Sequence, residues 1–195
     1  MTSSGGAGRG ARRRAHLVEV GVELLAEGGW PAVTTRAVAE RAGANLGLIH
    51  YHFGGSANLH AAIARRATEV VVNPVLDELL GARDEHAALS ALRRLLPATT
   101  DDTRATRLAV ELIAGAMRDP LLGEVLRDEL RQARADLADR LGQLHRDWTP
   151  QRRIGAATLI VALLDGLMLH RMVDPELPAD QALEALRELV ARTDS

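Results

Sequence analysis

The chain has 195 residues, 47% of them hydrophobic and only 2% aromatic, so its core must be built from Leu, Ala, Val and Ile. It contains no cysteine, which excludes a disulfide scaffold, a thiol nucleophile and a Cys-ligated metal. No apolar run reaches the roughly 18 residues of a membrane helix, and no apolar segment follows the N-terminal arginines as it would in a secretory signal. We therefore expect a cytoplasmic protein that does not engage a membrane.

Helix-forming residues dominate the composition, and the charges are unevenly placed along the chain. Ala, Leu, Arg and Glu are abundant and no stretch alternates apolar and polar residues, so we predict an all-α protein. Residues 1–66 contain eight arginines and four glutamates, a net charge of +4, and the remainder carries −6. A basic head on an acidic body is typical of a small DNA-binding domain joined to a domain that does not bind DNA.

The chain begins with a Ser/Gly-rich segment, residues 1–10, that we expect to be disordered. Arg9 and Arg12–Arg14 make it a basic arm. Such an arm is either a solvated tail or a contact to phosphates or the minor groove, and the sequence leaves both open. A first helix is predicted over about 11–27, and Gly28 and Gly29 end it. Its apolar face comprises Leu17, Val20, Gly21, Leu24 and Leu25.

Residues 34–53 are predicted to form two short helices joined by a tight turn. Thr34 or Thr35 caps the first helix and Asn45 caps the second, because their side-chain oxygens accept orphan backbone N–H groups. Gly43 lies at the turn, where a positive φ is often needed. Ile49 and Phe53 are expected to point inward, with Leu46 less certain of burial. This is the pattern of a helix-turn-helix, whose second helix enters the major groove of DNA.

Several stretches of the first third occur in a specific order and spacing: Leu24–Gly29, Thr34, Val38–Gly43 and Gly47–Gly54. With them, residues from about Arg12 to Ala64 resemble the DNA-binding domain of the TetR (tetracycline-repressor) family of transcriptional regulators. We therefore expect DNA contacts from the helix-turn-helix and the start of the next helix. The candidates are Thr34, Thr35, Arg36, Asn45, Leu46, Gly47, Leu48, His50, Tyr51, His52 and Ser56.

One position departs from the family pattern. The family usually carries a Lys near the start of the helix that follows, and Ser56 takes that position here, while Leu59 keeps its place. The phosphate contact of that Lys would be missing, so we expect somewhat weaker affinity for the DNA backbone without loss of DNA binding.

The remaining two thirds are predicted to be helical throughout, giving about nine helices in all. The expected domains are 1–10 (arm), 11–71 (DNA-binding) and 72–195 (effector-binding and dimerisation). The predicted helices of this part are 56–80, 85–96 (ending at Pro97), 103–117, 120–147, 151–173 and 180–192.

The helix at 151–173 is apolar nearly all round, so we expect it to be buried on most sides. The family resemblance implies that this helix and the one at 180–192 pair with the same two of a second chain in a four-helix bundle. A two-fold dimer presents its recognition helices about 34–36 Å apart, which matches a palindromic operator.

The resemblance also implies a small-molecule effector in the body, whose binding spreads the two heads. Candidate lining residues, chosen by helix position, are Arg107, Glu111, Met117, Trp148, Asp165 and Met168. Asp165 lies in an apolar stretch, where a charge is costly unless it is paired. It is either an ion pair or cap at the dimer interface, with His170 or Arg171 as partner, or a polar anchor in a ligand cavity.

No motif indicates catalysis or a cofactor. None of the seven histidines has the His-x-x-x-His spacing with a Glu that zinc proteases use, and His50 and His52 point to different sides of a helix. The chain has no nucleophile-elbow motif, P-loop or dinucleotide-binding glycine pattern. We predict a ligand-responsive, homodimeric transcriptional repressor with no enzymatic activity, cofactor or metal. The alternative is an all-helical protein-interaction module, with an enzyme third.

Overall fold

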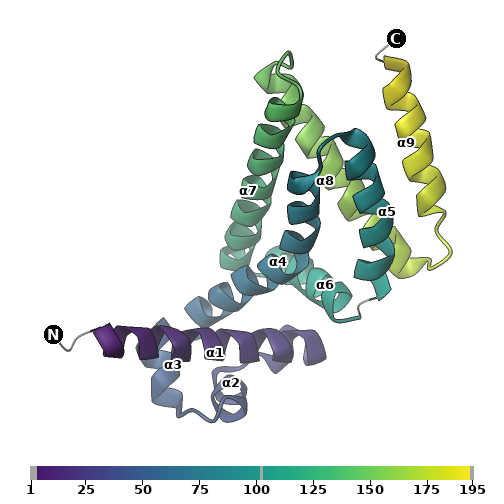
Figure 1. Ribbon diagram of the computed structural model, residues 1–195. Helices are drawn as coiled ribbons and strands as arrows, with labels where there is room; N and C mark the ends of the chain where they lie inside the picture. The colour runs from purple at the N-terminus through teal and green to yellow at the C-terminus, as the bar shows by residue number, and fades with distance from the viewer. Residues whose placement is uncertain (1–3, 102, 194–195) are drawn as a thin grey trace. The chain divides into compact units, whose positions relative to one another are not determined.

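The computed structural model describes residues 4–101 and 103–193, and within those ranges all regular secondary structure is helical (Figure 1), as predicted. Nine α-helices and one short 3₁₀ helix follow one another along the described chain. They are α1 (Ser4–Gly28), η1 (Trp30–Ala32), α2 (Thr35–Arg41), α3 (Leu46–Phe53), α4 (Ser56–Gly81), α5 (Glu85–Asp101), α6 (Thr103–Arg118), α7 (Pro120–Leu144), α8 (Pro150–Val173) and α9 (Ala179–Thr193).

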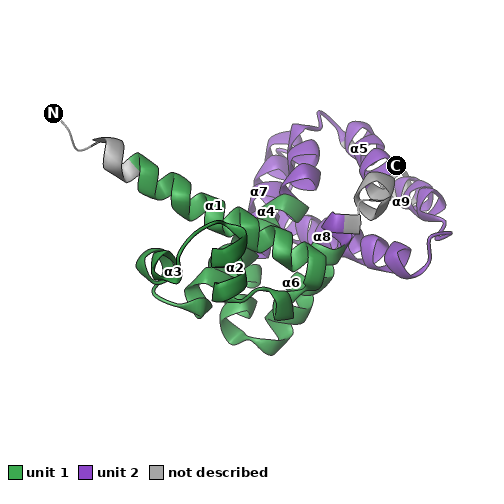
Figure 2. Ribbon diagram, turned by 90° about the horizontal axis from the view of Figure 1, so that it is seen from below, with its two compact units in different colours: residues 1–71, 107–129 green, residues 72–106, 130–195 purple. Residues whose placement is uncertain are grey.

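The chain folds into two compact units, green and purple in Figure 2. The first comprises residues 1–71 and 107–129, and the second comprises residues 72–106 and 130–195. This division differs from the predicted one, which left all of 72–195 in a second domain. The end of α6 and the start of α7 belong to the first unit because Leu108, Leu112, Leu122 and Val125 pack into its core.

The core of the first unit brings together apolar side chains from six helices, which are α1, α2, α3, α4, α6 and α7. Leu17 and Leu25 of α1, Ile49 of α3, Ile63 of α4 and Leu108 of α6 are all fully buried. They form one continuous cluster, so the recognition helix α3 rests on α1 and α4. Burying a side chain of this size contributes about 1.5–3 kcal/mol, which makes this cluster the main support of the helix-turn-helix.

The second unit has a separate core, built from α5, α8 and α9 and from the other ends of α4 and α7. Leu79 of α4, Leu92 of α5, Leu137 of α7, Ala157 of α8 and Leu183 of α9 are buried in one cluster. Polar contacts join the same helices at the surface: the Arg93 guanidinium on α5 pairs with Glu184 on α9, and the Arg140 guanidinium on α7 donates to the carbonyl of Ala82 at 2.6 Å. The unit is therefore stabilised both by its apolar core and by polar contacts at its surface.

Two helices extend further than the sequence suggested. α1 begins at Ser4, so residues 4–10, expected to be disordered, are helical, and residues 1–3 lie outside the described part. A nucleated helix lengthens at one hydrogen bond per added residue, which offsets the poor helix propensity of glycine. α5 continues through Pro97 to Asp101, where we expected it to end at the proline. A proline in a helix removes one backbone donor, and here that loss does not end the helix.

α8 is less buried in the single chain than its composition suggested. Of its residues only Ala157 is buried, although we expected burial on most sides. Ile154, Leu159, Leu169 and Val173 are exposed apolar side chains on this helix. By length and composition α8 would also qualify as a membrane span, against our expectation from the sequence, but the apolar helices of soluble proteins satisfy the same criteria.

Candidate DNA-binding surface

Local hydrogen bonds define both helices of the helix-turn-helix. The Thr34 hydroxyl accepts from the N–H of Ala37 at 3.0 Å and caps α2, and the Asn45 side chain accepts from the N–H of Leu48 at 3.0 Å and caps α3. Gly43 has φ +57°, a conformation that glycine adopts without steric cost. The predicted caps and the predicted turn glycine are therefore confirmed.

α3 has one buried and one open face. Ile49 is fully buried and Phe53 is 5% exposed, as predicted, whereas Leu46 is 46% exposed and belongs to the open side. Tyr51 is 81% exposed and stands in edge-to-face contact with the ring of His52 at 5.0 Å. An exposed aromatic with a hydroxyl at its tip is suited to contact a base edge or a phosphate.

The predicted DNA-binding residues all belong to this unit, and the structure buries none of them. Those on the open side of α2, α3 and the start of α4 are exposed, and three are half-buried. The exposed ones are Thr34, Arg36, Asn45, Leu46, Gly47, His50, Tyr51 and Ser56; the half-buried ones are Thr35, Leu48 and His52. Their contacts to DNA remain predictions.

Part of the positive charge of the head is paired with the head's own glutamates, which the sequence did not reveal. Arg41 on α2 makes a two-pronged ion pair with Glu27 on α1, at 3.0 and 2.8 Å. This contact raises the pKa of Arg41 and lowers the pKa of Glu27. The pair fastens α2 to the end of α1 and leaves less charge for DNA than the count of arginines suggests.

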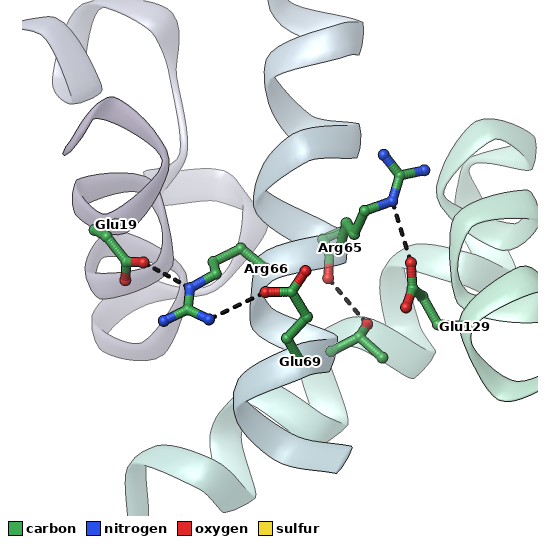
Figure 3. Close-up of polar contacts among 7 residues, drawn as sticks. Glu19, Arg65, Arg66, Glu69 and Glu129 are labelled. Carbon is green, nitrogen blue, oxygen red and sulfur yellow. Dashed lines mark hydrogen bonds and ion pairs between the residues drawn. The ribbon is translucent and has the colours of Figure 1, made fainter. Parts of the chain in front are cut away.

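Two consecutive arginines on α4 extend this network in two directions, as Figure 3 shows. Arg66 lies between Glu19 on α1, at 2.6 Å, and Glu69 on its own helix, at 3.0 Å. Arg65 reaches Glu129 on α7, at 3.1 Å. The hydrogen bonds that the Arg66 guanidinium donates to the two carboxylates raise the pKa of Arg66. α4 is thereby held between the first helix of the head and the start of α7.

Glu111, a candidate effector ligand, instead joins α6 to the helix-turn-helix. Its carboxylate accepts from the backbone N–H of Trp30 at 3.1 Å, and its carbonyl accepts from the Trp30 indole at 2.8 Å. Gly115 makes room for the indole, since a Cβ there would lie 2.3 Å from the indole nitrogen. Glu111 is therefore a packing contact of the first unit, and its assignment to an effector pocket stays a prediction.

The six effector candidates are divided between the units, and the structure does not gather them within either one. Arg107, Glu111 and Met117 belong to the first unit, where Met117 is 84% exposed. Trp148, Asp165 and Met168 belong to the second. Trp148 is already covered, because the His145 ring stacks on it at 4.1 Å and the Arg152 guanidinium lies 4.3 Å from the centre of its ring.

The second unit has a groove that none of these candidates lines. It has a volume of about 590 Å³ and runs along the end of α4 and the first half of α5. Its polar lining includes Asp77, Glu78 and Arg94, and the last two are paired at 3.1 Å. Sequence reasoning missed this groove because it depends on how α5 turns back on α4 after Gly81.

Asp165 has an unusual environment for a carboxylate on a helix surface. Crowding by neighbouring side chains raises its pKa by desolvation, and the charge of Arg134 opposes that rise. His170 and Arg171, the partners suggested by sequence, do not contribute to this shift. The ionised form is therefore disfavoured in the folded protein.

Asp165→Asn is expected to raise the free energy of unfolding at pH 7. A raised folded-state pKa means that folding opposes ionisation; this cost is absent below the unfolded pKa of about 3.9, grows as pH rises from there to the folded pKa, and is constant above it. The variant and the wild type should therefore converge near pH 4 and separate above it, measured by urea unfolding at several pH values. A variant less stable at pH 7 would show that the attraction of Arg134 outweighs desolvation.

Among the described residues, no group of three His, Asp or Glu side chains is arranged to hold a metal ion. His50 and His52 both lie on α3, one exposed and one half-buried. The arrangement that the unit does offer is a capped, glycine-turned pair of helices with an open polar face. Such a pair places its second helix in the major groove of DNA.

Comparison with known proteins agrees with this geometry. The model of the bacterial regulatory proteins of the tetR family matches residues 17–67, and the model of the C-terminal part of BetI-type transcriptional repressors matches residues 84–195. The HTH-type transcriptional regulator BetI of Escherichia coli O17:K52:H18 (strain UMN026) is 27% identical over 175 residues, covering 88% of this chain and 87% of the relative. The BetI regulator of Burkholderia lata is 28% identical over 163 residues, covering 81% of each.

Solved structures show the same fold over nearly the whole chain. A transcriptional regulator of Streptomyces coelicolor A3(2) superposes with a TM-score of 0.76 at 30% identity, covering 91% of this chain and 97% of that one. One from Pseudomonas aeruginosa PAO1 superposes with a TM-score of 0.71 at 24% identity, covering 92% of this chain and 90% of that one. The chain thus belongs to the TetR family of ligand-responsive, DNA-binding transcriptional regulators, with a C-terminal part of the BetI repressor type.

Proposed function

We propose that this regulator acts in the cytoplasm as a homodimeric repressor that binds a palindromic operator and is released by a small-molecule effector. The observation that carries the proposal is the open face of α3, which is capped by Asn45 and presents Tyr51 at 81% exposure above a fully buried Ile49. A helix with one face packed on the core and the opposite face exposed is suited to contact the edges of the bases. The role is regulatory and not enzymatic.

The homodimer is supported by the exposed stripe of α8. Its open residues recur every three or four positions, so they lie on one helix face. Small residues in the stripe let a second helix approach closely, and the large apolar ones gain by leaving water. The stripe comprises Gly155, Leu159, Ala162, Leu169 and Val173, which are exposed, and Gly166, which is half-buried. We propose that α8 and α9 of two chains pair there in a four-helix bundle.

The effector is proposed to bind in the second unit. The groove along α4 and α5 has the volume of a small-molecule site, which is usually about 300–1,000 Å³. Its mixed acidic and basic lining favours a polar or zwitterionic molecule over a purely aliphatic one. The residues of α4 that line this groove belong to the same helix that packs against α3 in the first unit. A ligand in the groove would therefore contact the helix that supports α3.

A footprint with the purified protein, at physiological salt, on the DNA upstream of its own coding region tests the proposal. We expect a protected palindrome whose half-sites lie about one helical turn apart, or a little more. Binding should weaken steeply as salt rises, because counterions are released from the phosphates. Binding that is unaffected by salt, or retained equally by unrelated DNA, would favour a protein-interaction module.

A further inference from the structure

The basic segment at the start of the chain is folded onto the helix-turn-helix. α1 begins at Ser4, so Arg12, Arg13 and Arg14 are residues of a helix and not of a free tail. Arg13 is half-buried, whereas Arg12 and Arg14 are exposed. Two of these three arginines make contacts with the parts of the chain that orient α3, and each contact has its own geometry.

Arg13 contacts the turn that leads into the recognition helix. Its guanidinium donates to the carbonyl of Gly43 at 3.1 Å, across 30 positions of sequence. Within the turn, the N–H of Gly43 donates to Glu40 at 3.1 Å, and the N–H of Ala44 donates to Ala39 at 2.9 Å. Arg13 therefore binds the turn from outside, two residues before the Asn45 cap of α3.

Arg14 contacts the other end of the same helix. Its guanidinium carbon lies 4.9 Å from the centre of the Phe53 ring. Phe53 is the last residue of α3 and is buried in the core of the unit. A guanidinium over an aromatic face is attracted by the ring quadrupole, whose face is negative, and also shields the ring from water.

We propose that Arg13 and Arg14 are positioning residues for operator recognition: Arg13 fixes the turn before α3, Arg14 fixes its last residue, and neither neutralises a DNA phosphate. The inference rests on the proposed operator binding, and it assigns two of the basic residues that sequence alone left between a solvated tail and a DNA contact. A phosphate contact and a positioning contact differ in a measurable way, because only the first releases counterions.

The test compares Arg13→Gln with Arg12→Gln in the full-length protein. The two variants lose the same charge at adjacent positions of α1, so Arg12→Gln is the matched control. Affinity for the operator and for an unrelated duplex is measured over a series of salt concentrations. For Arg13→Gln we expect operator affinity to fall about 5- to 10-fold, within the range of the net effect of one ordinary hydrogen bond.

The salt dependence decides between the two roles. For Arg13→Gln, affinity for the unrelated duplex and the slope of log affinity against log salt should stay as in the wild type. A slope smaller by about 0.9, the value for one lost phosphate contact, would overturn the proposal. Equal loss of operator discrimination in Arg12→Gln would overturn it as well.

Hydrogen exchange provides a measurement that needs no DNA. The amide of Ala44, bonded to the Ala39 carbonyl, should exchange faster in Arg13→Gln and at the wild-type rate in Arg12→Gln. Unchanged exchange in Arg13→Gln would show that Arg13 does not hold the turn. If the wild type binds no operator, the proposed function fails, while the exchange result still tests the contact itself.

Arg14 is tested by a conservative pair. Arg14→Gln removes the cation above Phe53 and should lower operator affinity about 2- to 5-fold, within the range of an exposed cation–π contact. Arg14→Lys keeps a cation there and should recover most of the loss. Equal losses in both variants, accompanied by a smaller salt slope in Arg14→Gln, would assign Arg14 to DNA instead.

Discussion

Leu159→Arg is expected to convert the dimer into a monomer and to lower operator affinity by at least about 100-fold. Leu159 is 73% exposed in the single chain and lies in the middle of the apolar stripe of α8. An arginine there would place an unpaired charge in the proposed interface, where desolvation is costly. Loss of the second head removes the gain from bivalent binding, typically 10²–10⁴-fold.

Sedimentation velocity and operator titration measure the two parts of this prediction, and Gln132→Arg is the control. Gln132 is exposed on α7 and donates to Asp136 at 2.8 Å, so an arginine keeps a partner there. The control adds the same charge and should remain dimeric with wild-type affinity. A Leu159→Arg protein that is still a dimer would show that the subunits associate through another surface.

Tyr51→Ala is expected to lower operator affinity about 10- to 100-fold, the usual range for losing a base-edge contact, and to leave the dimer and the stability intact. The side chain is 81% exposed, and substitutions at such positions typically change the free energy of unfolding by less than about 0.5 kcal/mol. Fluorescence anisotropy with operator and unrelated duplexes measures the loss, and thermal unfolding checks the stability.

Two further variants define the source of that effect. Tyr51→Phe removes only the hydroxyl, so a loss equal to that of Tyr51→Ala assigns the effect to a hydrogen bond, and a small loss assigns it to the ring. Met117→Ala removes a side chain that is 84% exposed on α6 of the same unit and should not alter DNA binding. Wild-type operator affinity in Tyr51→Ala would mean that the groove-facing side of α3 was misplaced.

Features that depend on neighbouring residues were predictable from the sequence. Thr34 caps α2 and Asn45 caps α3 through amides only three residues away. The positive φ of Gly43 and the burial of Ile49 and Phe53 also follow from spacing within a single turn of helix. Such interactions form between groups that the chain already holds close together, so residue type and spacing are sufficient to predict them.

The net charge of a segment was less informative, because it does not show whether a charged side chain is free or paired with another. The sequence indicated a basic head, but the structure pairs Arg41 with Glu27, and Arg66 with Glu19 and Glu69. The net charge already includes the glutamates that pair with these arginines, but it does not say which arginine each glutamate contacts. Whether an arginine faces solvent, a carboxylate or a carbonyl depends on which helix crosses it and at what angle.

The sequence by itself therefore determined the all-helical class, the helix-turn-helix and the family of this protein. Only the tertiary structure decided the contacts of Glu111 and Arg13, and the packing of 107–129 with the head. The Trp30–Glu111 contact joins residues 81 positions apart, and the Arg13–Gly43 contact joins residues 30 positions apart. Residues so far apart in sequence come into contact only when the helices pack. Composition and local spacing therefore cannot predict these contacts.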